Sequence, residues 1–196
     1  MSATQLVIRL ATEADAARVA SIYAPGVERT AASFEEVAPG PDEMSRRIAS
    51  TLPVYPWLVA ELNGRVEGYA YASQHHVRAG YRWSVNTSVY IDDACQGRGL
   101  GRALYTSLFA VLRAQGHLNA YAGIAIPNAA SVGLHESMGF RLVGVYTGVG
   151  FKFGAWRDVG WWHLQLAPLP SAPEPPVPLE AVRARDGWSR LLRGER

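Results

Sequence analysis

The sequence is short of several residue types, and each shortage narrows the class of protein. Cys95 is its one cysteine, so no internal disulfide can form, and we expect a reduced, cytoplasmic protein. No apolar run approaches the roughly 20 residues of a membrane-spanning helix. Residues 1–10 lack the basic and apolar segments of a signal peptide. The net charge of +2 is too small to favour nucleic acid or a membrane surface as partner. Lysine is nearly absent as well, because Lys152 is the single one.

The composition is that of one folded domain followed by a short tail. The 196 residues, 48% of them apolar and 18% charged, are enough to bury a core. Six prolines between Pro168 and Pro178 predict an extended segment. We therefore expect a domain over residues 1–167 and a flexible tail over residues 168–196, which packs on the domain or on a partner. Val182, Trp188, Leu191 and Leu192 give the end of this tail a weak amphipathic helical pattern.

Hydrophobic periodicity predicts strands and helices that alternate along the domain. Thr12 is the expected N-cap of the first helix, and Pro41 suits the first turn of the second. Gly116 is a natural C-terminal stop for a third helix, and Asn128 is the expected N-cap of a fourth. Helices are predicted over 42–50 and 101–115, and strands over 6–9, 57–61, 66–72, 83–91, 120–126, 141–149 and 158–165.

A glycine-rich segment, Gln96–Gly101, lies between an apolar strand and an amphipathic helix. Glycines allow the backbone to approach an anion closely, and the N–H groups of the loop and helix start can bind phosphate oxygens. Arg98 and Arg102 lie on the same turn. The glycine spacing does not fit a dinucleotide fingerprint, and the segment lacks the Gly-Lys-Ser/Thr of a nucleotide P-loop. A tight turn that binds nothing is the remaining alternative.

Two motifs together resemble those of the GNAT superfamily of acetyltransferases. Val89-Tyr90-Ile91 precedes Gln96-x-x-Gly99-x-Gly101, and Asn128-Ala129-Ala130-Ser131 begins the second motif. The resemblance implies an α/β fold in which helices flank a mixed, mainly antiparallel sheet. It also implies that the sheet splays near Tyr90, where acetyl-CoA enters. The cofactor-binding residues implied are Val89, Tyr90, Ile91, Gln96, Gly97, Arg98, Gly99, Leu100, Gly101, Arg102, Asn128 and Ser131.

Within that superfamily, residues 6–166 most resemble acetyltransferases for phosphinothricin, methionine sulfoximine or arsinothricin. The likeness includes Tyr55–Glu61 and Gly150–Gly160. It implies that the α-amine of a small amino acid analogue attacks the thioester directly in a ternary complex, and that the enzyme is a homodimer. The N–H of Tyr90 is the expected oxyanion donor. The substrate-binding residues implied are Phe34, His76, Arg78, Tyr81 and Lys152.

The chain departs from these relatives at the expected general base. Asn86 stands where they carry a glutamate, and His76 replaces a lysine. An amide cannot accept a proton at useful pH. Two consequences are open: the proton leaves through water, through His135, or through His75 or His76, or else the substrate differs from phosphinothricin or turnover is poor. A structural role in the hydrophobic core is an equally good interpretation of His135.

The sequence is compatible with three hypotheses for the function: acetylation of an amino acid analogue, acetylation of another amine, and a sensor that binds acetyl-CoA without catalysis. No set of His, Cys and carboxylate residues has the spacing of metal ligands, so we expect no metal. We also expect no serine nucleophile, because no Ser-His-Asp arrangement is visible.

Overall fold

The computed structural model describes residues 5–195 and has one seven-stranded sheet with strand order β1-β2-β3-β4-β5-β7-β6. Every neighbouring pair is antiparallel except β4 and β5, which run parallel. The expected mixed, mainly antiparallel sheet is therefore confirmed. Its strands are β1 (Leu6–Leu10), β2 (Trp57–Leu62), β3 (Arg65–Gln74), β4 (Ser84–Ile91), β5 (Asn119–Ile126), β6 (Arg141–Lys152) and β7 (Ala155–Gln165).

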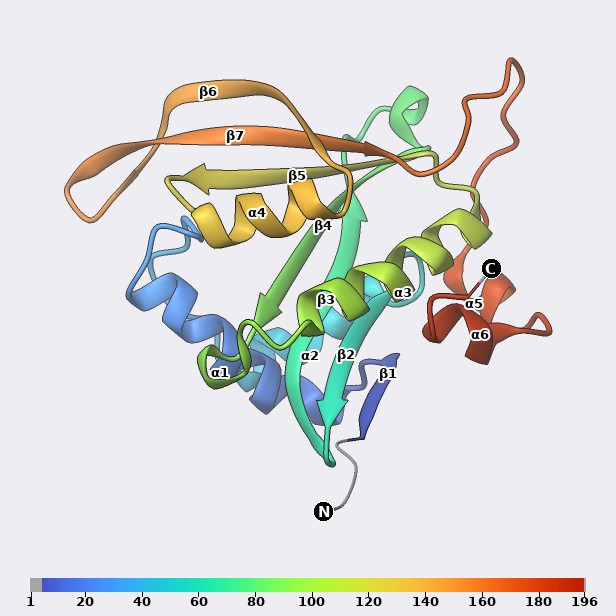
Figure 1. Cartoon of the computed structure of the whole chain (residues 1–196), viewed down its shortest axis with the longest axis horizontal. Helices are drawn as coiled ribbons and strands as arrows, with labels where there is room; N and C mark the ends of the chain where they lie inside the picture. The colour runs from blue at the N-terminus through green and yellow to red at the C-terminus, as the bar shows by residue number, and fades with distance from the viewer. Residues whose placement is uncertain (1–4, 196) are drawn as a thin grey trace.

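Helices cover both faces of the sheet, because the central strands carry apolar side chains on both sides. On β2, Leu58 and Ala60 face one core cluster, while Trp57 and Val59 face another. The first cluster packs under α3 (Leu100–Gln115) and the second under α1 (Ala16–Glu28) and α2 (Pro41–Thr51). Figure 1 shows α4 (Ala129–Ser137) beneath β5, on the side of α3.

The element boundaries differ from the prediction at two turns. At the start, a 3-10 turn, η1 (Glu13–Asp15), precedes α1, and the Asp15 carboxylate accepts hydrogen bonds from Thr12 N and from both Nη atoms of Arg9. At the far edge, β6 and β7 are longer than predicted and form one hairpin. Phe153 and Gly154 turn this hairpin with positive φ angles of 51° and 72°. A phenylalanine in that conformation gives no sequence signal for a turn.

The sheet opens between β4 and β5. The two strands pair only over Ser84–Asn86 and Asn119–Tyr121, while β4 continues to Ile91 and β5 to Ile126. Thr87 Oγ1 donates a hydrogen bond of 3.3 Å to Tyr121 O at the end of the paired stretch. In Figure 1, β5, β6 and β7 cross the top of the molecule while β4 runs steeply away from them. The expected splay is therefore present beside Tyr90.

The C-terminal segment packs on α3 instead of forming a single helix. It contains two short helices, α5 (Leu179–Arg183) and α6 (Trp188–Leu192), separated by Gly187 with φ +92°. Leu179 and Val182 are buried. Gln115 Nε2 donates to Val177 O at 3.0 Å, and Ser107 Oγ donates to Leu192 O. The tail was expected to pack on the domain or on a partner, and in the structure it packs on the domain. The domain boundary at residue 167 and the flexibility of the tail stay predictions.

Within residues 5–195, no helix combines the length and apolar character needed to cross a bilayer.

Candidate active site

The glycine-rich loop presents an uncapped helix start. After the 3-10 turn η3 (Asp93–Cys95), Gly97 and Gly99 take positive φ angles of 72° and 81°. Gly99 is the N-cap of α3, and no side chain caps the helix. The N–H groups of the first turn have no partner within the helix, so they can bind an anion such as a pyrophosphate. The loop itself is exposed, and Arg98 lies exposed within it.

Two other residues of this segment have partners inside the protein. Arg102 Nη2 donates to Ser137 Oγ at 2.9 Å, at the end of α4, and its expected contact with the pyrophosphate stays a prediction. Gln96 Nε2 donates to Asp93 Oδ1 at 3.0 Å. Gly101 has a packing role: a Cβ there would lie 2.9 Å from Leu134 Cδ2. The glycine therefore allows α3 to lie close to α4.

The start of α4 has the predicted cap. Asn128 Oδ1 accepts a hydrogen bond of 3.1 Å from Ser131 N, so Asn128 is the N-cap at the end of β5. His135 lies one turn further, buried, with Nε2 2.9 Å from Tyr105 Oη and Nδ1 2.7 Å from Ser131 O. Burial lowers the pKa of His135. Both ring nitrogens have protein partners, which is the arrangement of a core histidine, and the catalytic role expected of His135 stays a prediction.

Backbone N–H groups of β4 point into the opening, but the N–H of Tyr90 is not one of them. Asp92 N donates to Glu67 O on the β3 side, and Tyr90 pairs with Tyr69 in the same ladder. Because N–H groups alternate in direction along a strand, Tyr90 N–H points to β3. The N–H groups of Val89 and Ile91 point to the opposite edge of β4, where β5 no longer pairs with it. The expected oxyanion donor is therefore corrected from Tyr90 to one of these two neighbours.

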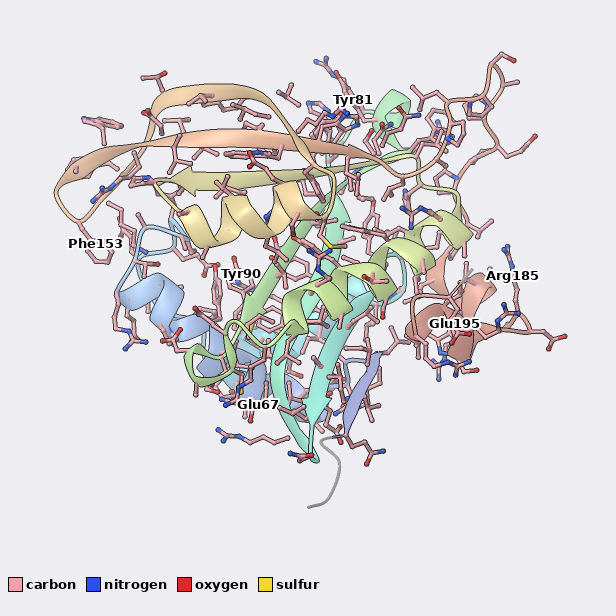
Figure 2. All side chains as sticks on the ribbon, in the orientation of Figure 1. Glu67, Tyr81, Tyr90, Phe153, Arg185 and Glu195 are labelled. Carbon is pink, nitrogen blue, oxygen red and sulfur yellow. The ribbon has the colours of Figure 1, made fainter. Side chains whose placement is uncertain are left out.

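The side chains of Asn86 and Tyr90 lie on the face of β4 that is turned toward α1, opposite the face covered by α3. The Tyr90 ring packs edge-on against Tyr23 and stacks on Tyr69, with ring centroids 4.9 and 5.2 Å apart. Burial raises the pKa of the Tyr90 phenol well above its ordinary value. Figure 2 labels Tyr90 between α1 and α4, at the open part of the sheet. Asn86 lies at the closed end, where Oδ1 is 2.8 Å from His75 Nδ1.

A cavity of about 350 Å³ lies on the β6–β7 hairpin, where Val159 and Trp161 pair with Ala125 and Gly123 of the free part of β5. The register of β6 and β7 shifts between Tyr146 and Gly150, and the resulting bulge forms part of the wall. The ring of Phe34 lies directly on Gly150, where a Cβ would overlap it. Trp161 lines the cavity, and its Nε1 is buried without a hydrogen-bond partner among residues 5–195. The remaining lining residues are Val149, Phe151 and Val159.

The other expected substrate residues fall into two groups. His76, Arg78 and Tyr81 are exposed on the segment after β3, with the rings of His76 and Tyr81 4.7 Å apart. Lys152 is buried and does not reach the cavity as a free cation. Its Nζ donates to three backbone carbonyls: Val27 O at 2.6 Å, Ser33 O at 2.6 Å and Glu35 O at 2.8 Å. The ammonium has three hydrogens and all are used, so Lys152 fixes the loop that carries Phe34.

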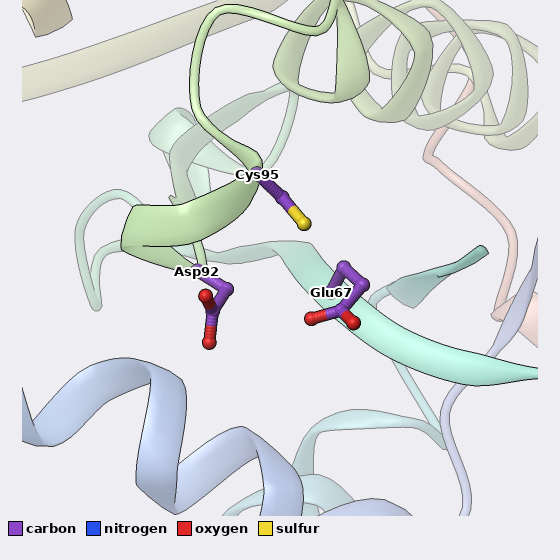
Figure 3. A group of neighbouring side chains, drawn as sticks. All are labelled: Glu67, Asp92 and Cys95. Carbon is purple, nitrogen blue, oxygen red and sulfur yellow. The ribbon is translucent and has the colours of Figure 1, made fainter.

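Glu67, Asp92 and Cys95 are the one group of potential metal ligands within reach of one another in the described part of the chain (Figure 3). Arg18 lies against both carboxylates: its Nη2 contacts Glu67 Oε2 and donates to Asp92 Oδ2 at 2.7 Å. The hydrogen bond from Arg18 contributes to a lowered pKa of Asp92. The guanidinium of Arg18 already neutralises the two carboxylates that would bind a metal cation, so we assign no metal to the group.

Comparisons with known proteins identify the class of this site. The family described as "Acetyltransferase (GNAT) domain" matches residues 8–161. The chain is 38% identical over 175 residues to a phosphinothricin N-acetyltransferase of Streptomyces viridochromogenes, covering 89% of this chain and 95% of that one. It is 40% identical over 162 residues to an L-methionine sulfoximine/L-methionine sulfone acetyltransferase of Salmonella typhimurium, covering 82% and 95%. The chain belongs to the GNAT family of acetyltransferases.

Solved structures agree with this assignment. A putative acetyltransferase from Salmonella typhimurium, solved with its cofactor acetyl-CoA, has a TM-score of 0.80 at 39% identity, covering 86% of this chain and 98% of that one. A phosphinothricin acetyltransferase from Sinorhizobium meliloti in complex with acetyl-CoA also has a TM-score of 0.80, at 34% identity, covering 88% and 92%. Acetyl-CoA is therefore the cofactor of this class, and the uncapped start of α3 beside the opening of the sheet fits it.

Proposed function

We propose that the chain transfers the acetyl group of acetyl-CoA to the α-amine of a small amino acid analogue of the phosphinothricin, methionine sulfoximine or arsinothricin kind. The observation that carries this proposal is the opening between β4 and β5. It has an uncapped, glycine-rich helix start on one face and a cavity of about 350 Å³ on the other. The names of the relatives support the class of acceptor.

On the donor side, the chain supplies mostly backbone groups. The residues that hold the pyrophosphate are Gln96 to Gly101, with Arg98 as the nearby cation. Asn128 and Ser131 border the opening from the end of β5. Bound acetyl-CoA supplies an activated acetyl group as a thioester. The N–H of Val89 or Ile91 stabilises the negative charge that develops on the carbonyl oxygen.

On the acceptor side, an aromatic cavity receives the substrate's side chain and cations receive its acidic group. Phe34 and Trp161 form walls of the cavity. Arg78 is suited to a carboxylate or phosphinate, because its planar fork matches two oxygens. His76 and Tyr81 flank Arg78 on the same segment. Lys152 and His135 act in the fold: the first holds the Phe34 loop and the second packs α4 on α3.

We also propose that the enzyme is a cytoplasmic homodimer, on the evidence of Cys95 and of the edge strand β6. Cys95 is a free thiol and buried. The β6 edge exposes Val143, Tyr146 and Phe151, which are 58–64% exposed, and Trp156 across the turn is 69% exposed. A long apolar edge of this kind favours pairing with a second copy. Light scattering should give twice the monomer mass, and Val143→Lys should lower it; a monomer at micromolar concentration contradicts the proposal.

A thiol-release assay with acetyl-CoA tests the function. Phosphinothricin and methionine sulfoximine should each release coenzyme A, whereas a polyamine should not. Release with the polyamine alone favours an acetyltransferase for another amine. Binding of acetyl-CoA in calorimetry without release for any acceptor favours a sensor. Absence of acetyl-CoA binding contradicts the whole assignment.

A further inference from the structure

His75 and Asn86 form a hydrogen-bonded pair whose geometry fixes the state of the imidazole. Asn86 Oδ1 lies 2.8 Å from His75 Nδ1, and Asn86 Nδ2 donates to Gln74 O at 3.3 Å. The second contact orients the amide, because its NH₂ group must face the carbonyl of Gln74. The oxygen of Asn86 therefore faces His75.

That orientation determines which ring nitrogen of His75 carries the proton. An amide oxygen only accepts hydrogen bonds, so His75 Nδ1 must be the donor and carry a hydrogen. The neutral ring then holds its free lone pair on Nε2. A hydrogen bond to one ring nitrogen commonly selects the tautomer of a histidine that accepts protons at the other nitrogen. The half-buried ring is thus prepared to take a proton at one defined atom.

The pair lies where the two halves of the proposed site meet. The ring of His75 stacks on Tyr121, with centroids 4.4 Å apart, and Tyr121 is the β5 partner of Asn86 at the closed end of the opening. On the other side, His75 meets Trp161 edge-on at 6.2 Å, and Trp161 lines the cavity. His75 therefore touches both the end of the opening and a wall of the cavity.

We propose that His75 is the catalytic base that accepts the proton of the substrate's amine, and that Asn86 is its positioning residue. This inference rests on the proposed function and specifies the proton route at that site. The ammonium group gives one proton to His75 Nε2, which becomes an imidazolium. The neutral amine forms the N–C bond as the C–S bond breaks, and its second proton leaves with the sulfur to give the thiol. His75 then returns its proton to water.

The titratable rings around His75 come from four segments. Tyr81 lies 6.1 Å away on η2 (Ala79–Tyr81), and His76 is the neighbour in sequence. Tyr121 lies against one face, and His163 of β7 packs on Tyr121 at 4.8 Å. His163 is itself bonded to an asparagine, with Nε2 2.8 Å from Asn119 Oδ1. This second histidine–asparagine pair provides a matched control.

The kinetic test compares His75→Gln with His163→Gln. The first variant should lower kcat by about 10²–10⁴-fold, the usual contribution of a general base. It should also remove the acidic limb of the kcat profile against pH, while the affinity for acetyl-CoA in calorimetry stays within twofold. His163→Gln should keep both the rate and the limb. Adding Asn86→Glu to His75→Gln should restore at least tenfold of the lost rate, because a carboxylate then lies at the same place.

The second readout needs no turnover. Nitrogen-15 NMR of the imidazole rings should show His75 with a proton on Nδ1 at neutral pH, and Asn86→Leu should move that proton to Nε2. An Nε2-protonated His75 in the unsubstituted protein overturns the inference, as does His75→Gln with unchanged kcat and an unchanged pH profile. If the unsubstituted protein acetylates none of the acceptors, the proposed function fails first, and the base assignment fails with it.

Discussion

At the scale of single residues, the indole of Trp161 has the buried polar atom most directly available to a bound acceptor. Its N–H is buried and has no partner in the described part of the chain, although buried donors are normally paired. Trp161 also lines the cavity and contacts His75. We propose that an oxygen of the bound acceptor becomes the partner of this donor.

Replacing Trp161 by phenylalanine keeps an aromatic wall and removes the N–H. We expect the KM of the acceptor to rise by about 5–10-fold, as for the loss of one hydrogen bond, with kcat changed less than twofold. Initial rates over a range of acceptor concentrations measure this. An unchanged KM would show that the indole N–H does not meet the substrate.

Arg78→Ala separates the acceptor half of the site from the donor half. Because the guanidinium is the cation proposed for the acceptor's acidic group, its removal should raise the KM of phosphinothricin by tenfold or more. The dissociation constant of acetyl-CoA should stay the same in calorimetry. Equal KM values for the variant and the unsubstituted enzyme would remove Arg78 from the site.

At the scale of elements, the close packing of α3 on α4 depends on Gly101. A methyl group there would lie 2.9 Å from Leu134, so Gly101→Ala should separate the helices that border the cofactor loop. We expect a loss of about 1–3 kcal/mol in stability and weaker binding of acetyl-CoA. Gly133→Ala on α4 is the matched control: it meets nothing within 4 Å, and it should be neutral or stabilising by up to ~1 kcal/mol. Urea unfolding of both variants decides this, and equal effects would contradict the packing argument.

The loop after α3 makes the stability of the fold sensitive to acid. Burial lowers the pKa of His117 to about 4 from an ordinary value near 6.5. The folded protein thus holds this ring neutral, whereas the unfolded chain takes up a proton below pH 6.5. The free energy of unfolding should therefore fall as pH drops from about 6.5 to 4. His117→Phe should reduce that slope in urea unfolding; an unchanged slope would assign the acid sensitivity to other groups.

Elements were predictable where a local pattern sets them, and not where distant residues do. The cap at Asn128 and the splay beside Tyr90 follow from motifs that are continuous in sequence. The pairing of His75 with Asn86 depends on the register of β3 and β4, which matches Ser73 with Asn86. The direction of the Tyr90 N–H depends on that same register, so the motif alone pointed to the wrong donor.

At the scale of the whole molecule, contacts across more than 100 residues assemble the acceptor side. Lys152 joins the β6–β7 hairpin to the end of α1 and to the loop between α1 and α2. The sequence marked Lys152 as unusual, and the family resemblance implied a substrate contact for it. Nothing local in the sequence shows that three carbonyls surround its ammonium group. The C-terminal segment likewise packs on α3. Of its buried side chains, the amphipathic pattern in the sequence marked Val182 but not Leu179.

The packing of that segment gives a prediction for the whole fold. Val182 is fully buried, so Val182→Ala should cost about 1–3 kcal/mol of unfolding free energy. Ala181→Ser, at an exposed neighbouring position, should cost less than 0.5 kcal/mol, as is usual at the surface. Thermal unfolding of both variants measures the difference; equal midpoints would show that the segment does not stabilise the domain.

In the proposed reaction, this chain moves an acetyl group from acetyl-CoA to the α-nitrogen of an amino acid analogue. The most direct test is to incubate the full chain with acetyl-CoA and phosphinothricin or methionine sulfoximine, and to identify the product by mass and by NMR. The product should carry one added acetyl group, bonded to the α-nitrogen, and an equal amount of free coenzyme A should appear. Coenzyme A released without an N-acetylated product, or no product with any amino acid analogue, would contradict it.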